Sequence, residues 1–560
     1  MQELDSGVWN SKIRAAFWIV GIFFAGITAY TTRYFINGDA IAYIEMGEAL
    51  RTGQWSGLTN LTYSPAYPVL LGIAQALLST NPMNELQLLR TVNFTCFLLA
   101  MAACEFLMFF VKREIRHTTE DGWCLFPINV FTALCYSMFL VCSLVFVRIR
   151  LLNPDMMIFA IVMTAAALLL WIREDAGSYL KFVILGVITG FGYLTKSFFL
   201  PFSPIFFLMA GLCVGSVKKS IPRVVVGILA MLIVAAPLMA SLSSRVGRFS
   251  YGELGPHAYA TIISGMGQPV TPEVLNHSPK VSRFVYEIPC TRPAGFDICY
   301  WHEGLKPVFN LRAQLKTIYY NVKEIFTDTP WLLLIVIWYL ILMWLGTVRI
   351  GPLVPASMFL LLIMPAIAGI GFYCLILMEM RYIGPYLFLG FVGLTVSLRF
   401  PEGDLKTYKK SLSLSLALIS FFMVMLVHSA IDQSIRGLIS TDKQLSYRDS
   451  FKEEVLVKDF LTRQDIQRGD CAAVIGNPPV YWARMAGIKI LAEIPSQEEF
   501  IHSSEQQRKR SLVALEMSNI KAVVAKSGFF NGLNSEGWQP VPGTRDYFIF
   551  LFERMAERNS

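Results

Sequence analysis

Charged side chains are scarce in this chain of 560 residues, since only 16% are Asp, Glu, Lys or Arg. A water-soluble protein contains about 25%. Hydrophobic residues make up 54% instead, and they come in blocks of about twenty, the length that crosses a bilayer core of roughly 30 Å. The composition therefore excludes an ordinary soluble protein and predicts a polytopic membrane protein.

Several motifs that point to other protein classes are absent. No GxGxxG or Walker pattern follows a predicted strand, which argues against nucleotide binding. No CxxC pair or close cluster of His and Cys occurs, so a zinc site has no supporting spacing. The formal net charge of +8 is spread over loops and comes with no RNA- or DNA-binding motif, so we expect no nucleic-acid partner. The sequence also contains no internal repeat.

Apolar spans predict about eleven transmembrane helices. The first follows Lys12 and Arg14 and lacks a cleavage site, so we interpret it as a retained signal anchor. A stretch at 66–78 is too short to span a bilayer and predicts a re-entrant or surface helix. The predicted spans are 15–31, 88–111, 123–147, 154–172, 181–198, 200–216, 222–241, 330–347, 352–377, 383–398 and 411–430.

Basic residues predict the orientation of these helices. With the N-terminus in the cytoplasm, every cytoplasmic loop carries at least one Lys or Arg, as the positive-inside rule requires. The loops 32–87 and 242–329 then lie outside, and so does the tail. The basic residues of the inside loops are Lys12, Arg14, Lys112, Arg113, Arg116, Arg173, Lys181, Lys218, Lys219, Arg223, Arg349, Arg399, Lys406, Lys409 and Lys410.

The tail predicts a small soluble α/β domain. It holds β-type runs at 471–477, 520–528 and 546–553, with helix-like segments between the first two. We therefore expect a mainly α-helical transmembrane domain over 1–430 and an extracytoplasmic α/β domain over 431–560. A lid or acceptor-recognition role suits this domain better than nucleotide binding.

The loop 32–87 brings the first group of polar residues to the outer face. Asp39 starts a predicted helix, with Tyr43 on the same stripe. Asp39 is either an N-cap of this helix or a general base at the membrane surface. Tyr63 and Tyr67 lie in the stiff turn YSPAYP. They either anchor the chain at the interface or stack on sugar rings or isoprenoid.

Three more segments bring charges to helix ends on the same predicted face, at 147–157, 192–202 and 375–386. Charges beside membrane helices are costly and need a reason. One explanation is snorkelling or local pairing, as between Glu379 and Arg381. The other is that cations from separate segments bind a lipid phosphate. The polar side chains of these segments are Arg148, Arg150, Asp155, Lys196, Glu379, Arg381 and Tyr382.

Taken together, the four segments resemble the GT-C superfamily of polytopic glycosyltransferases. The resemblance is to the branch that holds protein mannosyltransferases, the aminoarabinose transferase of lipid A and the RgtA/B/C/D-like proteins. The matching pieces are GDAIAYIEMGEALRTGQW…YSPAYPVLLG (38–72), NPDMM (153–157), GYLTKS (192–197) and EMRYIGPYLFL (379–389). They come in the family's order.

This resemblance implies an enzyme of the bacterial inner membrane that moves a sugar from a polyprenyl-phosphate donor to a lipid, glycan or protein acceptor. Asp39 corresponds to the catalytic acid residue, which deprotonates or orients the acceptor while the anomeric carbon is inverted. The candidates to stabilise the leaving phosphate are Arg148, Arg150, Lys196 and Arg381. Asp155 is either structural or a partner to these cations. The full set of expected substrate-binding residues is Tyr43, Tyr63, Tyr67, Arg148, Arg150, Asp155, Lys196, Glu379, Arg381 and Tyr382.

The acid motif of this sequence differs from that of the metal-dependent members of the family. Metal-dependent members use Asp-x-Asp-like pairs, whereas Asp39 is followed by Ala and Ile, so we expect no metal cofactor. The loop 242–329 also holds Cys290 and Cys299, which predict a disulfide if it faces an oxidising compartment. Three histidines of this loop lack the close spacing of a zinc site: His257, His277 and His302.

Three other functions compete with a glycosyltransferase. A transporter or flippase for a lipid-linked sugar shares the ligand, but such proteins often contain inverted repeats. An O-antigen ligase or polymerase shares the substrate class but does not predict the arrangement of the loop 32–87. A non-catalytic scaffold is the third, with Asp39 as a helix cap only.

Overall fold

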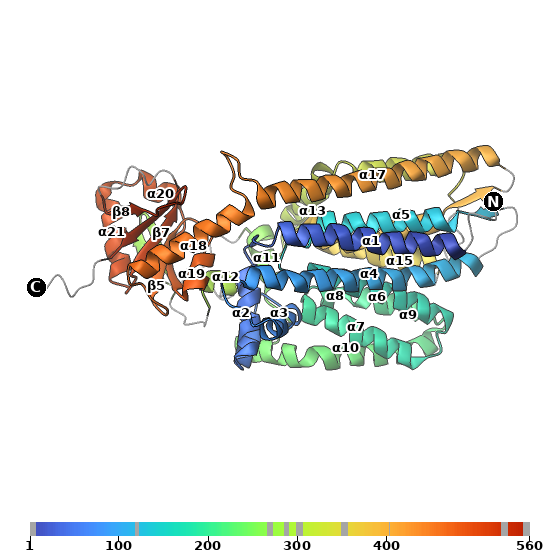
Figure 1. Cartoon of the computed structure of the whole chain (residues 1–560). Coiled ribbons are helices and arrows are strands. Elements are labelled where there is room, and N and C mark those ends of the chain that lie inside the picture. Colours follow the sequence, from blue (N-terminus) through green and yellow to red (C-terminus); the bar gives the residue numbers. More distant parts are fainter. Residues whose placement is uncertain are drawn as a thin grey trace, which may run out of the picture.

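A bundle of long helices carries an α/β domain at one end, here called the domain end (Figure 1). The computed structural model describes residues 7–117, 123–265, 273–284, 290–297, 306–348, 357–401, 404–527 and 536–552. The chain starts at the far end of the bundle and finishes in the α/β domain. The fold is mainly α-helical, as the sequence predicts.

Each of the eleven predicted spans coincides with a helix over most of its described residues. Six helices are long and apolar enough to cross a membrane on their own, and α13 with α14 forms a pair bent by 86°. One correction falls at the start of the third span, where Trp123–Leu125 is a strand, β1, paired with β4 (Arg399–Pro401). The bundle helices are α1 (Gly7–Thr31), α4 (Glu85–His117), α5 (Ile128–Leu140), α6 (Asp155–Glu174), α7 (Tyr179–Thr195), α8 (Phe199–Phe202), α9 (Pro204–Leu212), α10 (Val217–Val246), α13 (Leu311–Asp328), α14 (Leu332–Trp344), α15 (Met358–Cys374), α16 (Met380–Val396) and α17 (Leu405–Leu438).

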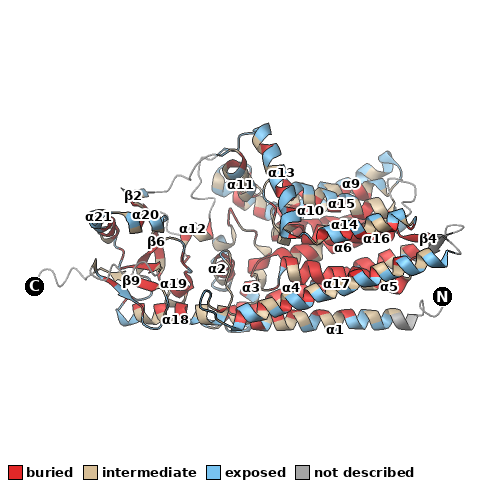
Figure 2. Ribbon diagram, turned by 90° about the horizontal axis from the view of Figure 1, so that it is seen from above, coloured by how far each residue is buried: buried red, intermediate tan, exposed pale blue. Residues whose placement is uncertain are grey.

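The bundle helices fall into two groups, according to how much of their apolar surface is buried. The apolar windows of the third and fourth spans are 83% and 72% buried, whereas those of α1, α10 and α17 are 22–28% buried. Figure 2 shows exposed outer faces on α1 and α17 and buried residues inside. The exposed positions include Phe23, Ile233 and Val424. Because lipid tails are as apolar as these side chains, the outer faces fit a bilayer rather than water.

Two shorter helices lie beside each other at the domain end, and α2 runs across the bundle axis there (Figure 1). They are α2 (Ala40–Arg51) and α3 (Ala66–Leu77). A Cβ at Gly47 would lie 2.8 Å from the Gly72 backbone nitrogen, and one at Gly72 would lie 2.5 Å from the Gly47 carbonyl oxygen. Only glycine at both positions allows this approach, which fixes α2 against α3.

The α/β domain is built on a seven-stranded sheet in the order β2-β3-β6-β5-β7-β9-β8. The three central strands are parallel, and helices α19 (Tyr481–Ala486) and α21 (Glu505–Glu516) occupy the predicted helical segments. Strands β2 and β3 come from the loop 242–329, so this sheet joins two distant parts of the sequence. The strands are β2 (Glu273–His277), β3 (Lys280–Arg283), β5 (Cys471–Ile475), β6 (Lys489–Ile494), β7 (Ala522–Lys526), β8 (Trp538–Pro540) and β9 (Tyr547–Leu551).

One buried arginine holds the α/β domain to the bundle. Arg484, on α19, places its Nε 2.5 Å from Glu85 Oε1 and its Nη2 2.8 Å from Glu85 Oε2, at the start of α4. Its Nη1 also lies 3.1 Å from Glu48 and 3.6 Å from Glu45, both on α2. Tyr481 donates a hydrogen bond of 2.7 Å to Glu85 as well. The domain is thereby fixed to α2 and α4 together.

This contact predicts the effect of replacing the arginine. Arg484→Gln leaves the Glu85 carboxylate buried without its cation, and breaking a buried ion pair costs about 3–5 kcal/mol. We expect a clearly lower midpoint of thermal unfolding for the purified protein in detergent. Lys509→Gln is the control, because Lys509 pairs with Glu505 on the exposed surface, where such pairs contribute little. Equal midpoints for the two variants would contradict the assignment.

Candidate active site

Asp39 precedes α2 but does not cap it. Its backbone is helical and its side chain accepts no hydrogen bond from the first turn of α2. The carboxylate instead accepts a hydrogen bond of 3.1 Å from the Tyr63 hydroxyl. The N-cap interpretation of Asp39 is therefore wrong, and its half-buried carboxylate is available for another task.

A cavity of about 660 Å³, here called the arginine cavity, opens beside Asp39 at the domain end. Arg148 follows the third span and Arg381 lies in the first turn of α16, so two separate segments supply its cations. Glu379 lines the same cavity. The other lining residues come from the segment before Asp39, from the end of the third span and the residues after it, from α13 and the turn before α14, and from the start of α16: Asn37, Gly38, Val145, Phe146, Leu151, Glu324, Asp328, Thr329, Trp331, Met378 and Met380.

A network of charges borders this cavity. Lys196 Nζ lies 2.9 Å from Asp155 Oδ1, and Arg381 Nε lies 3.7 Å from Asp155 Oδ2. Arg381 also pairs with Glu379 at 2.5 Å and donates to the Tyr382 hydroxyl at 3.0 Å. Lys196 stands 3.6 Å above the centre of the Tyr382 ring. Three of the predicted segments therefore meet in space, as a shared binding site requires.

Arg148 occupies a strained position. The third span ends in a π-helix, η3 (Val141–Val147), and Arg148 follows it with φ +65° and ψ 110°. A non-glycine residue at positive φ and a π-helical turn are both costly, and both concentrate at functional sites. Within the described part of the chain Arg148 makes no ion pair, although its Nε donates to the Val145 carbonyl at 2.9 Å. Its cation is exposed beside the cavity.

Three predicted binding residues lie away from this cavity. Tyr67 is fully buried and donates to Asn93 at 2.5 Å. Tyr43 is buried against Tyr63, with ring centres 4.7 Å apart. Burial and then the negative charge of Asp39 hold the Tyr43 pKa well above its usual value, so the phenol stays protonated. Arg150 donates at 2.7 Å to Tyr447 of the α/β domain.

Sequence reasoning missed the residues that fix the backbone before Asp39 to the segment after Arg148. Arg90, buried in α4, donates to the Phe35 and Arg150 carbonyl oxygens. Asn37 exchanges hydrogen bonds with the Leu152 backbone, at 3.0 Å where it accepts. An arginine inside the apolar span 88–111 was the available signal, since such a charge needs a polar partner.

No group of three or more His, Cys, Asp or Glu side chains gathers as a metal site would require, within the part of the chain described above. The absence of a metal cofactor stays a prediction. Cys290 is a buried free thiol whose pKa is raised well above its usual value by burial. Its predicted partner Cys299 lies outside the described residues, and so does His302.

The bundle, the crossing helices and the α/β domain give the chain the GT-C fold that the sequence resemblance predicted, and the solved structures named below share it. No protein-family model and no curated protein matches the sequence. Solved structures do match. ArnT from Cupriavidus metallidurans in the apo state is 13% identical at a TM-score of 0.56, over 96% of this chain and 98% of ArnT. ArnT bound to undecaprenyl phosphate is 12% identical at 0.52, over 96% and 97% of the two chains. The apo oligosaccharyltransferase of Archaeoglobus fulgidus gives 12% identity at 0.45, over 92% and 69%.

The backbone strain at Arg148 gives a prediction that separates strain from charge. Arg148→Gly relieves the positive φ, whereas Arg148→Ala keeps it, and both remove the cation. We expect the glycine variant to be more stable to unfolding than the alanine variant by roughly 1 kcal/mol. Thermal unfolding in detergent measures the difference. Equal stability of the two variants would show that Arg148 is not strained.

Proposed function

We propose that this protein is an integral-membrane glycosyltransferase. It moves a sugar from a polyprenyl-phosphate donor to a hydroxyl or amine of an acceptor, with inversion at the anomeric carbon. The observation that carries this proposal is Asp39. The Asp39 carboxylate does not cap α2 and accepts a hydrogen bond from Tyr63. It lies beside a cavity that is lined by two arginines from separate segments.

Asp39 acts as the general base. The acceptor oxygen or nitrogen attacks the anomeric carbon, and its proton passes to the Asp39 carboxylate. The bond between that carbon and the phosphate oxygen breaks, and its electron pair leaves with the polyprenyl phosphate. Tyr63, 3.1 Å from Asp39 Oδ1, orients the carboxylate.

The cations of the arginine cavity stabilise the leaving phosphate. Arg148 and Arg381 line the cavity, and Lys196 is linked to Arg381 through Asp155, which both cations contact. Preorganised cations stabilise the charge that develops on a leaving group more than water does. The fold shared with ArnT, a structure of which holds undecaprenyl phosphate, supports a polyprenyl phosphate as the ligand.

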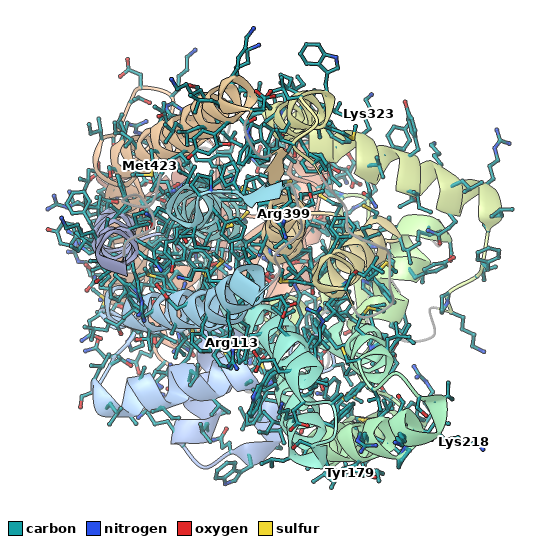
Figure 3. All side chains as sticks on the ribbon, turned by 90° about the vertical axis from the view of Figure 1, so that its right-hand side faces the viewer. Arg113, Tyr179, Lys218, Lys323, Arg399 and Met423 are labelled. Carbon is teal, nitrogen blue, oxygen red and sulfur yellow. The ribbon has the colours of Figure 1, made fainter. Side chains whose placement is uncertain are left out.

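The orientation proposed is N-terminus in the cytoplasm and α/β domain outside, in a bacterial inner membrane. The N-terminus and the α/β domain lie at opposite ends of the bundle in Figure 1. Figure 3 views the bundle from the end away from the domain and shows the helices end-on. Arg113, Lys218 and Arg399, labelled there, belong to the predicted cytoplasmic loops. The site then faces outward, where lipid-linked donors are used.

The general base is tested by Asp39→Asn. Because Asp39 does not cap α2, the variant will fold normally, and loss of a general base will slow transfer on the order of 10²–10⁴-fold. The assay follows labelled sugar from a panel of polyprenyl-phosphate sugars to acceptors in a membrane extract.

Asp404→Asn is the matched control for this experiment. Asp404 starts α17 and accepts from the Thr407 backbone nitrogen, a task that Asn also performs. Normal transfer by Asp39→Asn would disprove the general base. Donor binding without transfer, unchanged in the variant, would favour a flippase.

The phosphate site is tested by Arg381→Gln. The loss of charge-assisted hydrogen bonds to the lipid phosphate will weaken polyprenyl-phosphate binding about 10- to 100-fold. Arg436→Gln, at the same end of the bundle on exposed α17, removes a cation paired with Asp432 and will leave binding unchanged. Calorimetry in detergent provides the dissociation constants. Equal weakening by both variants would indicate a nonspecific charge effect.

A further inference from the structure

A second cavity of about 590 Å³, here called the seam cavity, lies where the α/β domain meets the bundle. Its walls come from residues 34–45 of the loop 32–87, from the segment 292–296 and from the α/β domain. Asn37 and Gly38 line this cavity and the arginine cavity alike. Asp39 therefore lies next to the residues that separate two cavities, so two substrates can approach it from different sides.

The topology of the α/β domain is a second indication, independent of the bundle, that the seam cavity is a ligand site. The chain passes from β5 to β6 on one side and returns to β7 on the other side of β5. Ligands of open α/β sheets bind outside the carboxyl ends of the strands at such a reversal. Asn477, just after β5, and Lys526, the last residue of β7, both line the cavity.

The walls of the seam cavity are aromatic. Phe35 and Tyr447 have ring centres 4.7 Å apart, and Tyr34 and Phe451 have theirs 5.1 Å apart. Each pair joins the loop 32–87 to α18 (Tyr447–Arg463) of the α/β domain. The apolar C–H faces of a pyranose ring pack well on aromatic rings, because the ring faces carry partial negative charge.

Charge argues for a neutral ligand. The described lining contains four acids and four bases, so their formal charges cancel. Two of the bases are already paired, since Lys526 lies 3.0 Å from Glu453 in the wall and Arg292 lies 3.0 Å from Glu493 outside it. A hydroxyl-rich molecule binds through hydrogen bonds and ring contacts and needs no net charge in the cavity wall. The volume falls in the range of small-ligand sites and is far too small for a folded protein.

One buried acceptor group lacks a partner. Glu45 lines the seam cavity and is 7% exposed, and its Oε1 accepts from the Thr291 backbone nitrogen at 2.8 Å. Its Oε2 has no hydrogen-bond partner within the described residues. An unsatisfied buried carboxylate oxygen costs free energy until a donor reaches it. A sugar hydroxyl is such a donor once the Glu45 side chain rotates toward the cavity, because Oε2 is closed to solvent in the present rotamer.

We propose that the seam cavity binds the acceptor and that the acceptor is a neutral saccharide, one hydroxyl of which donates to Glu45. This inference rests on the proposed glycosyl transfer. The sugar ring packs between the aromatic walls and presents another hydroxyl past Asn37 and Gly38 to Asp39. Product is then a new glycosidic bond between two sugars, not a glycosyl phosphate or a glycosylated side chain.

The experiment uses the full-length protein, a polyprenyl-phosphate donor with labelled sugar and membrane extract of the source organism. Labelled product that resists both protease and the mild acid that cleaves glycosyl phosphates is the expected result. Acid-labile label identifies a phosphate acceptor, and protease-sensitive label identifies a protein acceptor. Either result would overturn this inference while leaving the proposed transfer intact. Donor turnover without any transfer, or no turnover, would overturn both.

Glu45→Gln provides the residue-level test. Its apparent KM for the acceptor will rise about 10-fold or more, from the loss of a hydrogen bond to a charged group, with polyprenyl-phosphate binding unchanged. Glu48→Gln is the matched control, because Glu48 contacts the same Arg484 from the same helix but does not line the seam cavity. An equal rise in both variants would assign Glu45 a purely structural role.

Discussion

The arrangement of this protein depends on one guanidinium group that is buried where the α/β domain meets the bundle. Arg484 reaches Glu85 at the start of α4 and Glu48 on α2. A buried cation is tolerated only when carboxylates surround it, and their removal leaves charges that water cannot reach. The α/β domain, the crossing helix α2 and the bundle are therefore fixed as one unit, and the seam cavity lies where they meet.

In the reaction proposed above, two chemical tasks fall on different sides of Asp39. Arg148 and Arg381 bring positive charge to one side of Asp39, where a leaving phosphate needs it. Aromatic rings and Glu45 lie on the other side, where a neutral acceptor needs contact surface and a hydrogen bond. The strained backbone of Arg148 and the π-helix before it belong to the first side. Strain of this kind persists only where surrounding packing enforces it.

Much of the fold could be predicted because a bilayer imposes strong local rules. Apolar runs of about twenty residues identify spans whatever their neighbours are, and the short β-type runs of the tail became β5, β7 and β9. Strands β2 and β3 could not be predicted to join that sheet. The pairing of β3 with β6 links residues some two hundred positions apart, and no local pattern specifies such a partner.

Hydropathy and charge act locally along the chain, so the amino-acid sequence was enough to predict the membrane class, the spans and the four polar segments. It also placed Asp39, Lys196 and Arg381 among the candidates. Only the tertiary structure decided that Asp39 is no helix cap, that Lys196 and Arg381 share Asp155, and that Arg150 serves the domain contact instead. Side-chain partners are set by packing in three dimensions, and two residues at one helix end can point to different neighbours.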